Sequence, residues 1–213
     1  MMIEIQNLTK KINQEELLKN INITLLDGKI YGFVGRNGSG KSMLFKTICG
    51  FINPTTGKVL VNGKDIYKEN TFPEDTRALI EKPNFIGDLS GLENLKNLAQ
   101  IQNKINEKDI LKYMEIFGLL NSKDKAYKKY SLGMKQKLGI IQVLMEDPKI
   151  LILDEPFNGL EEQSVELLRN ILLEEKNKGK LIIIASHIKD DIDILADEIY
   201  KMDAGEIVDV QKR

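Results

Sequence analysis

The sequence has one cysteine, no apolar run of membrane length and almost no net charge, and each shortage argues against a class of protein. A single cysteine, Cys49, cannot form a disulfide within the chain, which fits a reducing compartment and predicts a buried thiol. The most apolar runs, KILILDE and KLIIIAS, are far shorter than the ~20 residues of a membrane helix, so we expect the chain not to span a membrane. The first ten residues, MMIEIQNLTK, contain no long apolar segment, so we expect no signal peptide. A formal net charge of −1 argues against a nucleic-acid binder that acts through a bulk positive field.

Short apolar runs alternate with segments of helical periodicity along the 213 residues. Such alternation predicts parallel βαβ units. Between Gly91 and Glu146 the pattern is mostly helical, and we expect a separate lobe there. The lysine-rich stretch 123–129 is expected to be a solvated surface. The predicted strands are 29–35, 76–82, 149–155 and 180–186, the hairpins are 57–66 and 198–210, and the remaining helices are 41–50, 161–177 and one from 189.

The segment GRNGSGKS, residues 35–42, matches the pattern G-x-x-x-x-G-K-[ST] between an apolar strand and a helix. Its glycines permit close approach to a ligand, and the loop N–H groups point at phosphate oxygens. We expect Lys41 to reach the β and γ phosphates and Ser42 to ligate Mg²⁺. A glycine-rich turn without a ligand is the alternative. The residues predicted to hold a nucleotide are Gly35, Arg36, Asn37, Gly38, Ser39, Gly40, Lys41, Ser42 and Met43.

Two carboxylates and the only histidine follow the two later apolar strands. A buried strand explains the apolar part of ILILDEP but not the acidic pair at its end. Asp154 is expected to hold Mg²⁺, directly or through water. Glu155 is expected to orient or deprotonate an attacking water. His187 follows LIIIAS at the carboxyl end of a predicted strand, where α/β sheets bind ligands, and we expect it to contact the γ-phosphate.

The segment YSLGMKQKLG, residues 130–139, predicts a helix with an unusual first turn. Ser131 is a good N-cap, and Leu138, Ile141 and Met145 recur at helical spacing. Gly133 costs such a helix about 1 kcal/mol relative to a good helix former. Either Gly133 is a tolerated defect, or an anion docks at this helix start, where N–H groups are free and the dipole is positive.

In order and spacing, GRNGSGKS, YSLGMKQKL, ILILDEP, NGLE and IIIASH resemble the Walker A, signature, Walker B, D-loop and H-loop motifs of ABC-type ATPases over essentially the whole chain. The resemblance implies an α/β P-loop NTPase fold with a mostly parallel core sheet, an N-terminal antiparallel β part and an inserted helical lobe. It also implies that two copies, identical or different, sandwich two ATP molecules. Ser131 and Gly133 would then contact the γ-phosphate of ATP bound to the second copy.

The signature segment departs from the usual LSGGQ pattern of that family. Tyr130, Leu132 and Met134 replace its leucine, first glycine and glutamine. SLGMKQ is similar to the signature of ATP-binding subunits in bacitracin- and lantibiotic-type exporters. The resemblance therefore implies membership of that subgroup and an active site that functions.

Three further positions depart from the family pattern. Glu81 stands where many members have a glutamine, and a carboxylate there can touch Mg²⁺ or the water but adds negative charge near the γ-phosphate. Glu161 replaces the usual D-loop aspartate. Ile12 falls where an aromatic residue commonly stacks on adenine, and loss of that stacking would weaken nucleotide binding by about 1–3 kcal/mol.

The resemblance implies one ABC ATPase domain over residues 1–213, with a RecA-like core and β part over 1–83 and 147–213 and a helical lobe over 84–146. We expect a subunit that hydrolyses ATP at the cytoplasmic face of a membrane for a separate permease, in an exporter. The permease would dock near residues 81–93 and the helical lobe. The alternative is a soluble ABC ATPase that acts on ribosomes or DNA, but those usually show a second ATPase domain, coiled-coil insertions or basic extensions, which we do not find in this sequence. A P-loop kinase is a third reading, disfavoured by the signature segment and His187.

The phosphate loop generates the first prediction. Lys41→Ala removes the cation expected on the β and γ phosphates, so ATP binding and hydrolysis should be lost while the fold is kept. Binding is measured by calorimetry and folding by circular dichroism. Parental ATP affinity in a folded Lys41→Ala protein would refute the phosphate role of this lysine.

Overall fold

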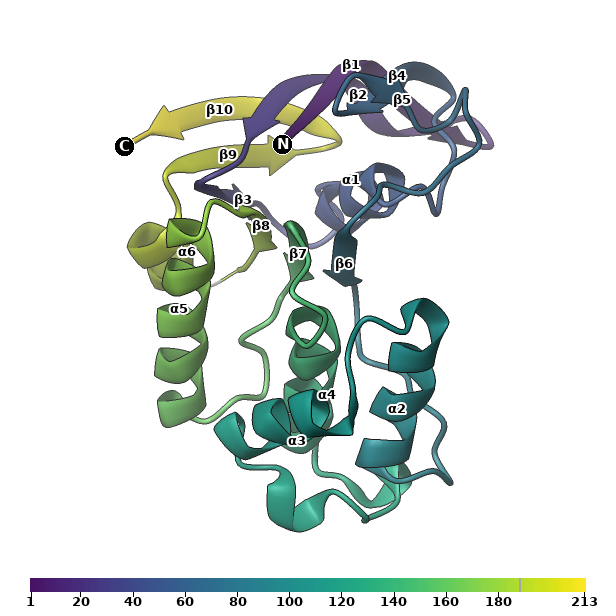
Figure 1. Cartoon of the computed structure of the whole chain (residues 1–213). Coiled ribbons are helices and arrows are strands. Elements are labelled where there is room, and N and C mark those ends of the chain that lie inside the picture. Colours follow the sequence, from purple (N-terminus) through teal and green to yellow (C-terminus); the bar gives the residue numbers. More distant parts are fainter. Residues whose placement is uncertain (188) are drawn as a thin grey trace.

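A computed structural model describes residues 1–187 and 189–213, and its helices and strands alternate as the sequence predicts. Figure 1 shows a β-rich part that holds both chain ends and, away from it, a part built of helices. The mixed α/β architecture with a largely parallel core sheet is confirmed. The division at residues 84 and 146 stays a prediction.

The N-terminal antiparallel part is a four-stranded sheet of order β2-β1-β4-β5. Alternate residues of its second strand are buried, so that Ile21, Ile23 and Leu25 face the core. Asn62 and Gly63, both with positive φ, form the turn that the Asn-Gly signal predicts. The strands are β1 (Met2–Ile12), β2 (Glu15–Leu26), β4 (Thr56–Val61) and β5 (Lys64–Asp65).

The core sheet has six strands in the order β10-β9-β3-β8-β7-β6. All neighbouring strands are parallel except β10, which pairs antiparallel with β9. The strand that leads into the phosphate loop, β3, lies between β8 and β9, so it is paired on both sides. The strands are β3 (Lys29–Val34), β6 (Thr76–Leu79), β7 (Ile150–Asp154), β8 (Leu181–Ala185), β9 (Glu198–Asp203) and β10 (Glu206–Lys212).

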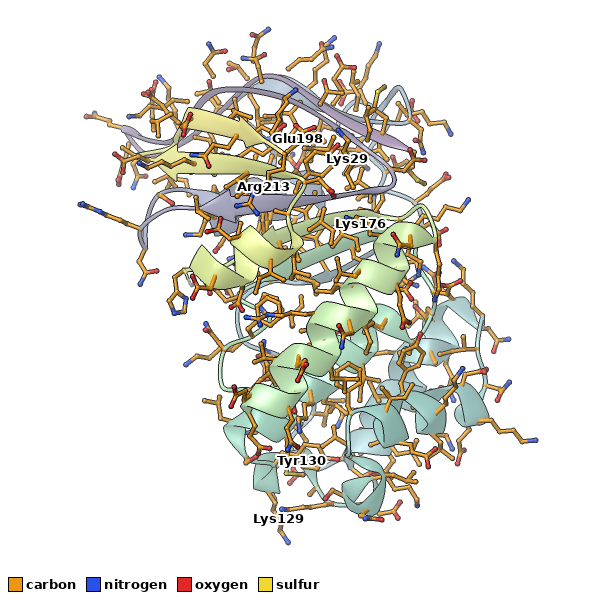
Figure 2. The ribbon with its side chains drawn as sticks, turned by 90° about the vertical axis from the view of Figure 1, so that its left-hand side faces the viewer. Lys29, Lys129, Tyr130, Lys176, Glu198 and Arg213 are labelled. Atoms are coloured by element: carbon orange, nitrogen blue, oxygen red, sulfur yellow. The ribbon has the colours of Figure 1, made fainter. Side chains whose placement is uncertain are left out.

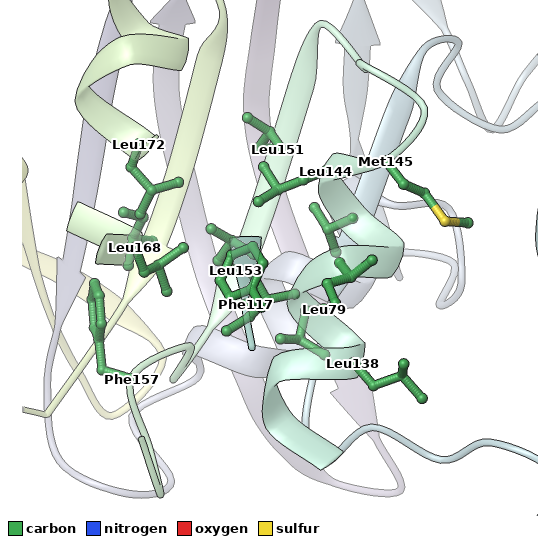
Figure 3. Close-up of a cluster of buried hydrophobic side chains, with 14 of the residues drawn as sticks. Leu79, Phe117, Leu138, Leu144, Met145, Leu151, Leu153, Phe157, Leu168 and Leu172 are labelled. Carbon is green, nitrogen blue, oxygen red and sulfur yellow. The ribbon is translucent and has the colours of Figure 1, made fainter. Parts of the chain in front are cut away.

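Alternate residues of the central strands contribute to two hydrophobic cores on opposite faces of this sheet. In β7, Ile150 and Ile152 pack with α1 (Lys41–Ile48) and the antiparallel sheet. Leu151 and Leu153 belong to the core on the other face (Figure 3). Because both faces are covered, β7 and β8 are buried along their whole length, and they are apolar except for Asp154 at the end of β7.

The helical block contains three helices and two short 3-10 turns. Its buried side chains belong to the same hydrophobic core as Leu151 and Leu153 of the sheet. Ser90 and Glu93 form a capping box at the first helix, and Asn106 and Asp109 form one at the second. No helix in the described part of the chain is long and apolar enough to cross a membrane. The block comprises α2 (Gly91–Gln102), α3 (Glu107–Ile116), α4 (Leu132–Leu144) and the turns Leu120–Ser122 and Tyr127–Lys129, and it is followed later in the chain by α5 (Glu162–Asn177) and α6 (Lys189–Leu195).

All four predicted core strands end earlier than the sequence predicts, and at two of them a glutamate explains the early end. The strand expected over 149–155 ends at Asp154, because Glu155 takes a left-handed backbone conformation with φ 52°. The strand expected over 76–82 ends at Leu79, and Glu81 also lies in the left-handed region with φ 64°. Such conformations are uncommon for residues other than glycine. Both glutamates therefore leave the sheet in sharp turns rather than as strand residues.

Ion pairs join the start of β9 and the residue before it to β3 and to α5. Lys29, at the start of β3, contacts the buried Glu198 of β9 with Nζ 2.7 Å from Oε1 (Figure 2). Lys176, near the end of α5, lies 3.0 Å from a carboxylate oxygen of Asp197.

The buried thiol of Cys49 confirms the sequence prediction, and burial raises its pKa to about 12.

The packing of α6 on β3 gives a stability prediction. A Cβ at Gly32 would lie 2.4 Å from Cγ2 of Ile192 and 3.0 Å from Cβ of Ala196. Gly32→Ala should lower the free energy of unfolding by about 1–3 kcal/mol, because the added methyl overpacks this contact. Gly87→Ala is the control, because its Cβ would meet only Lys128 at 3.6 Å. Urea unfolding measures the free energy of unfolding of both variants. If Gly32→Ala loses no more than Gly87→Ala, the close contact of α6 with β3 at Gly32 is contradicted.

Candidate functional site

A cavity of about 680 Å³ opens where β3, β6 and β7 end. Residues 37–43 of the phosphate loop and α1 line it together with Asp154 and Glu155. The structure thus brings together most of the residues predicted from the three strand-end motifs. Gly35, Arg36, Ser131, Gly133 and His187 do not line this cavity. Its lining residues are Leu17, Asn37, Gly38, Ser39, Gly40, Lys41, Ser42, Met43, Glu81, Lys82, Leu132, Gln136, Asp154, Glu155 and Asn158.

The phosphate loop closes tightly on its neighbours, and two of its glycines are required by geometry. A Cβ at Gly35 would lie 2.3 Å from the carbonyl oxygen of Met202, and Gly40 has φ 105° at the N-cap of α1. No described side chain caps this helix, so its first N–H groups face the cavity. Lys41 folds back over the loop, with Nζ 2.8 Å from the carbonyl oxygen of Gly35 and 3.3 Å from that of Arg36. The loop therefore presents N–H donors and an ammonium group, the donors that an anion needs.

The C-terminal hairpin is hydrogen-bonded to the phosphate loop. The Gly205 N–H, in the turn between β9 and β10, donates to the carbonyl oxygen of Ser39 over 3.0 Å. The carbonyl oxygen of Gly205 accepts from the Lys19 N–H of β2 over 2.8 Å. The turn at Gly205 therefore links β2 to the phosphate loop.

The Ser42 hydroxyl donates to the Asp154 carboxylate, with the two oxygens 2.5 Å apart. Burial raises the pKa of Asp154; Glu155 and Glu81 raise it further, whereas the Ser42 bond and Lys41 lower it. A buried carboxylate beside a hydroxyl provides two of the hard oxygen ligands that Mg²⁺ prefers. Within residues 1–187 and 189–213, no three His, Cys, Asp or Glu side chains gather as a metal-binding group. The pair fits a cation that takes its remaining ligands from water and a phosphate, as Mg²⁺ commonly does.

Glu155 and His187 meet beyond the ends of adjacent parallel strands, where Asp154 pairs with Ala185. The Nδ1 atom of His187 lies 2.7 Å from Oε2 of Glu155, and the backbone N–H of His187 donates to the same oxygen over 3.2 Å. The His187 side chain is 56% exposed. The carboxylate is thus held at the edge of the cavity by a ring that remains open to solvent on its other side.

Helix α4 begins as predicted, with Ser131 as its N-cap accepting from the Met134 N–H over 3.2 Å. A Cβ at Gly133 would lie 2.8 Å from the carbonyl oxygen of Gly159. The glycine therefore has a packing reason within one chain, which the sequence did not indicate. Ser131 is exposed beside it. One turn further along, the buried amide of Gln136 donates to the carbonyl oxygens of Glu155 and Pro156 over 3.2 and 3.0 Å.

The two departures at Glu81 and Ile12 lie in different surroundings. Glu81 lines the cavity, and its carboxylate pairs with Lys46 of α1, with 2.5 Å between Oε1 and Nζ. Ile12 is 45% exposed at the end of β1 and is not among the residues that line the cavity. Leu17 of β2 lines it instead. The stacking position of Ile12 stays a prediction.

Sequence reasoning missed Leu17, Gln136 and Asn158 as residues of the site. Each reaches the cavity from a segment whose own pattern is fully explained by a strand, a helix or a turn. Asn158 lies within NGLE and Gln136 within YSLGMKQKLG, two segments that the motif comparison already singles out. Leu17 carries no local signal that distinguishes it from the other residues of β2.

Residues 18–158 match the ABC transporter family. The chain is 41% identical over 211 residues to an uncharacterized ABC transporter ATP-binding protein, YybJ, of Bacillus subtilis (strain 168), covering 99% of this chain and 97% of that protein. It is 40% identical over 212 residues to the bacitracin transport ATP-binding protein BcrA of Enterococcus faecalis, covering 98% and 68% of the two chains. It is 36% identical over 207 residues to the lantibiotic transport ATP-binding protein SrtF of Streptococcus pyogenes, covering 97% and 89%.

Solved structures show the same fold at lower sequence identity. The ATP-binding subunit of an ABC transporter superposes with a TM-score of 0.90 at 24% identity, covering 100% of this chain and 90% of that one. The dimeric ABC transporter cassette MJ0796 gives a TM-score of 0.88 at 23% identity, covering 99% and 98%.

The buried charge of Asp154 gives a pH-dependent prediction. Asp154→Asn should raise the free energy of unfolding of the ligand-free protein at neutral pH, because it removes a buried negative charge while its amide oxygen still accepts from Ser42. The folded pKa is raised, so the charge destabilises the fold above that pKa, and the gain should shrink as the pH falls through it. Urea unfolding from neutral to acidic pH measures the change.

The exposed Asp88 is the control for this comparison. Its side chain is 84% exposed, and its hydrogen bond with Lys128 lowers its pKa, so Asp88→Asn should not stabilise the protein at neutral pH. A loss of stability in Asp154→Asn at neutral pH would show that the carboxylate is stabilising in the ligand-free site.

Proposed function

The chain belongs to the ABC transporter family as one of its ATP-binding subunits, which hydrolyse ATP to ADP and phosphate, and from this premise we propose which residues bind ATP and which cleave it. The observation that carries the proposal is the cavity of about 680 Å³ in which the phosphate loop faces Asp154 and Glu155. The hydrogen-bond donors proposed for the phosphates and the carboxylates proposed for catalysis therefore line the same cavity.

The loop over residues 35–43 holds the phosphates of ATP. Its N–H groups and the uncapped first turn of α1 donate to phosphate oxygens. The Lys41 ammonium group contacts two loop carbonyl oxygens in this structure. When the β and γ phosphates enter, it exchanges these oxygens for phosphate oxygens. This exchange of partners keeps the lysine satisfied in both states, so the loop is preformed for the ligand.

Ser42 and Asp154 hold Mg²⁺, with Glu81 as a further oxygen at the cavity edge. The hydrogen-bonded pair and the raised pKa of the buried Asp154 support this role, because a cation would offset the cost of the buried charge. When bound, the ion neutralises charge on the phosphate oxygens. The protein residues contribute ligands and their orientation.

Glu155 orients and deprotonates the water that attacks the γ-phosphate. His187 holds the Glu155 carboxylate through Nδ1 and its backbone N–H, and its side chain is exposed, so the ring would be free to contact the γ-phosphate once ATP is bound. A carboxylate that accepts two hydrogen bonds is fixed in direction, which a general base requires. His187 therefore positions the base and contacts the phosphate.

Two copies close on two ATP molecules, and the start of α4 contacts the nucleotide of the other copy. The exposed Ser131 hydroxyl at a helix N-terminus supports this contact, because such a start attracts anions. The glycine beside it also packs against Gly159 of its own chain, so Gly133 serves two surfaces in this proposal. The second copy can be identical or different.

The partner is a membrane-embedded permease, and the subunit acts peripherally at the inner face of the membrane, in an exporter. The similarity to bacitracin and lantibiotic transport proteins supports the exporter. Exposed apolar side chains support the docking region: Ile86 is 59% and Ile101 77% exposed near residues 81–93 and the helical block. The neighbouring gene tests this part of the proposal, since a multi-span membrane protein encoded there supports a transporter over a soluble ATPase.

Glu155→Gln and Ser131→Arg test the site and the pairing of copies together. Glu155→Gln removes the base, so hydrolysis should fall about 10²- to 10⁴-fold while ATP still binds. The uncleaved γ-phosphate should then keep the two copies closed. Adding Ser131→Arg places bulk between the helix start and the phosphate and should abolish this ATP-dependent dimer.

Size-exclusion chromatography at high protein concentration, with and without ATP, provides the readout. Glu155→Gln alone is the reference, and the double variant must still bind ATP. If the double variant dimerises as well as the single one, Ser131 does not contact a nucleotide on the other copy.

A further inference from the structure

Three carboxylates line the cavity in which we place a polyanion. Asp154 and Glu155 follow β7, and Glu81 follows β6. A triphosphate repels each of them, and the repulsion is strongest where few ions screen it. Asp154 has Ser42 and Glu155 has His187 as a hydrogen-bond partner at the site. The third carboxylate needs a partner of its own.

Lys46 is that partner, and it comes from the helix that begins with the phosphate lysine. Its Nζ lies 2.5 Å from Oε1 of Glu81, with the two side chains 29% and 62% exposed. Lys41 opens α1 and Lys46 lies in its last turn. Five residues of helix separate the two lysines by about 7.5 Å along the axis. One short rigid element thus carries a cation for the ligand at one end and a cation for Glu81 at the other.

The backbone around Glu81 leaves the direction of its side chain to contacts such as this ion pair. Its φ of 64° is uncommon for a glutamate, and the residue lies in an irregular segment after the end of β6. No regular hydrogen-bonded element fixes the direction of its side chain. The contact with Lys46 is therefore what sets whether the carboxylate lies along α1 or turns toward the bound phosphates.

We propose that Lys46 is a positioning residue for nucleotide binding: while no Mg²⁺ is bound, it neutralises Glu81 and holds its carboxylate at the end of α1, away from the incoming triphosphate. The inference rests on the proposed function of the cavity. It explains how this chain accepts a carboxylate at a place where added negative charge would otherwise weaken ATP binding.

A purely structural role for Lys46 makes a different prediction. A lysine in the last turn stabilises a helix through the dipole, and an exposed ion pair contributes little to folding. If stability were its only role, Lys46→Gln would have the same effect whatever residue stands at position 81. The positioning role makes the effect depend on the charge of residue 81.

Four proteins test this dependence: the parent, Lys46→Gln, Glu81→Gln and the double variant. ATP affinity is measured by calorimetry in EDTA, where no divalent cation masks the repulsion, and thermal unfolding checks the fold. Lys46→Gln should weaken ATP binding about three- to tenfold when residue 81 is Glu. In the Glu81→Gln background the same change should alter affinity less than twofold.

Two further variants serve as controls. Lys46→Arg keeps the charge and should bind ATP like the parent, which separates the charge from any folding defect. Lys128→Gln removes one positive charge from the exposed pair with Asp88, outside the cavity, and should leave affinity unchanged.

The outcomes separate this inference from the proposed function. An equal loss on Lys46→Gln in both backgrounds, or no loss in either, would overturn the positioning role while ATP binding by the parent stands. Absence of ATP binding by the parent, under conditions where it is folded, would overturn the proposed function and the inference with it.

Discussion

Parallel pairing of β3, β8 and β7 sets where every part of the site lies. In the ladder, Phe33 pairs with Ala185, and Ala185 pairs with Asp154, so the three strands end at the same edge of the sheet. The phosphate loop, His187 and the acidic pair follow these ends directly. A one-residue shift of any strand would exchange the faces of its side chains and displace the site residues that follow its end. The apolar character of β7 and β8 on both faces, and the helices that cover them, secure this register.

The site carries several features that reduce stability in the ligand-free chain. Asp154 is a buried carboxylate with a raised pKa, and Glu155 and Glu81 have left-handed backbones. Unfavourable groups of this kind concentrate at functional sites, where a ligand relieves them. ATP and its cation would satisfy the loop donors and offset the acidic charge at once. Binding and stability are therefore linked at this edge of the sheet.

Residues whose signal is local could be predicted from the sequence, and residues defined by distant contacts could not. The phosphate loop, the acidic pair and the helix after Ser131 are short patterns, and the structure contains each of them near its predicted bounds. Gln136 and Leu17 reach the cavity only because α4 and β2 pack against it, which no local pattern encodes. The packing of Gly133 on Gly159 and the pairing of Lys46 with Glu81 join residues 26 and 35 positions apart along the chain. Strand ends were misplaced where a glutamate adopts an uncommon backbone conformation.

The hydrogen bonds of Gly205 with Ser39 and Lys19 have a consequence for how the site forms during folding. Ser39 and Gly205 lie 166 positions apart along the chain, and β9 pairs with β3 beside them. Until β9 pairs with β3, the phosphate loop lacks the hydrogen bond that the Gly205 N–H donates. Contacts between residues so distant in sequence carry a high cost in loop-closure entropy, so the support of the phosphate loop should form late in folding, after the local turns and helices.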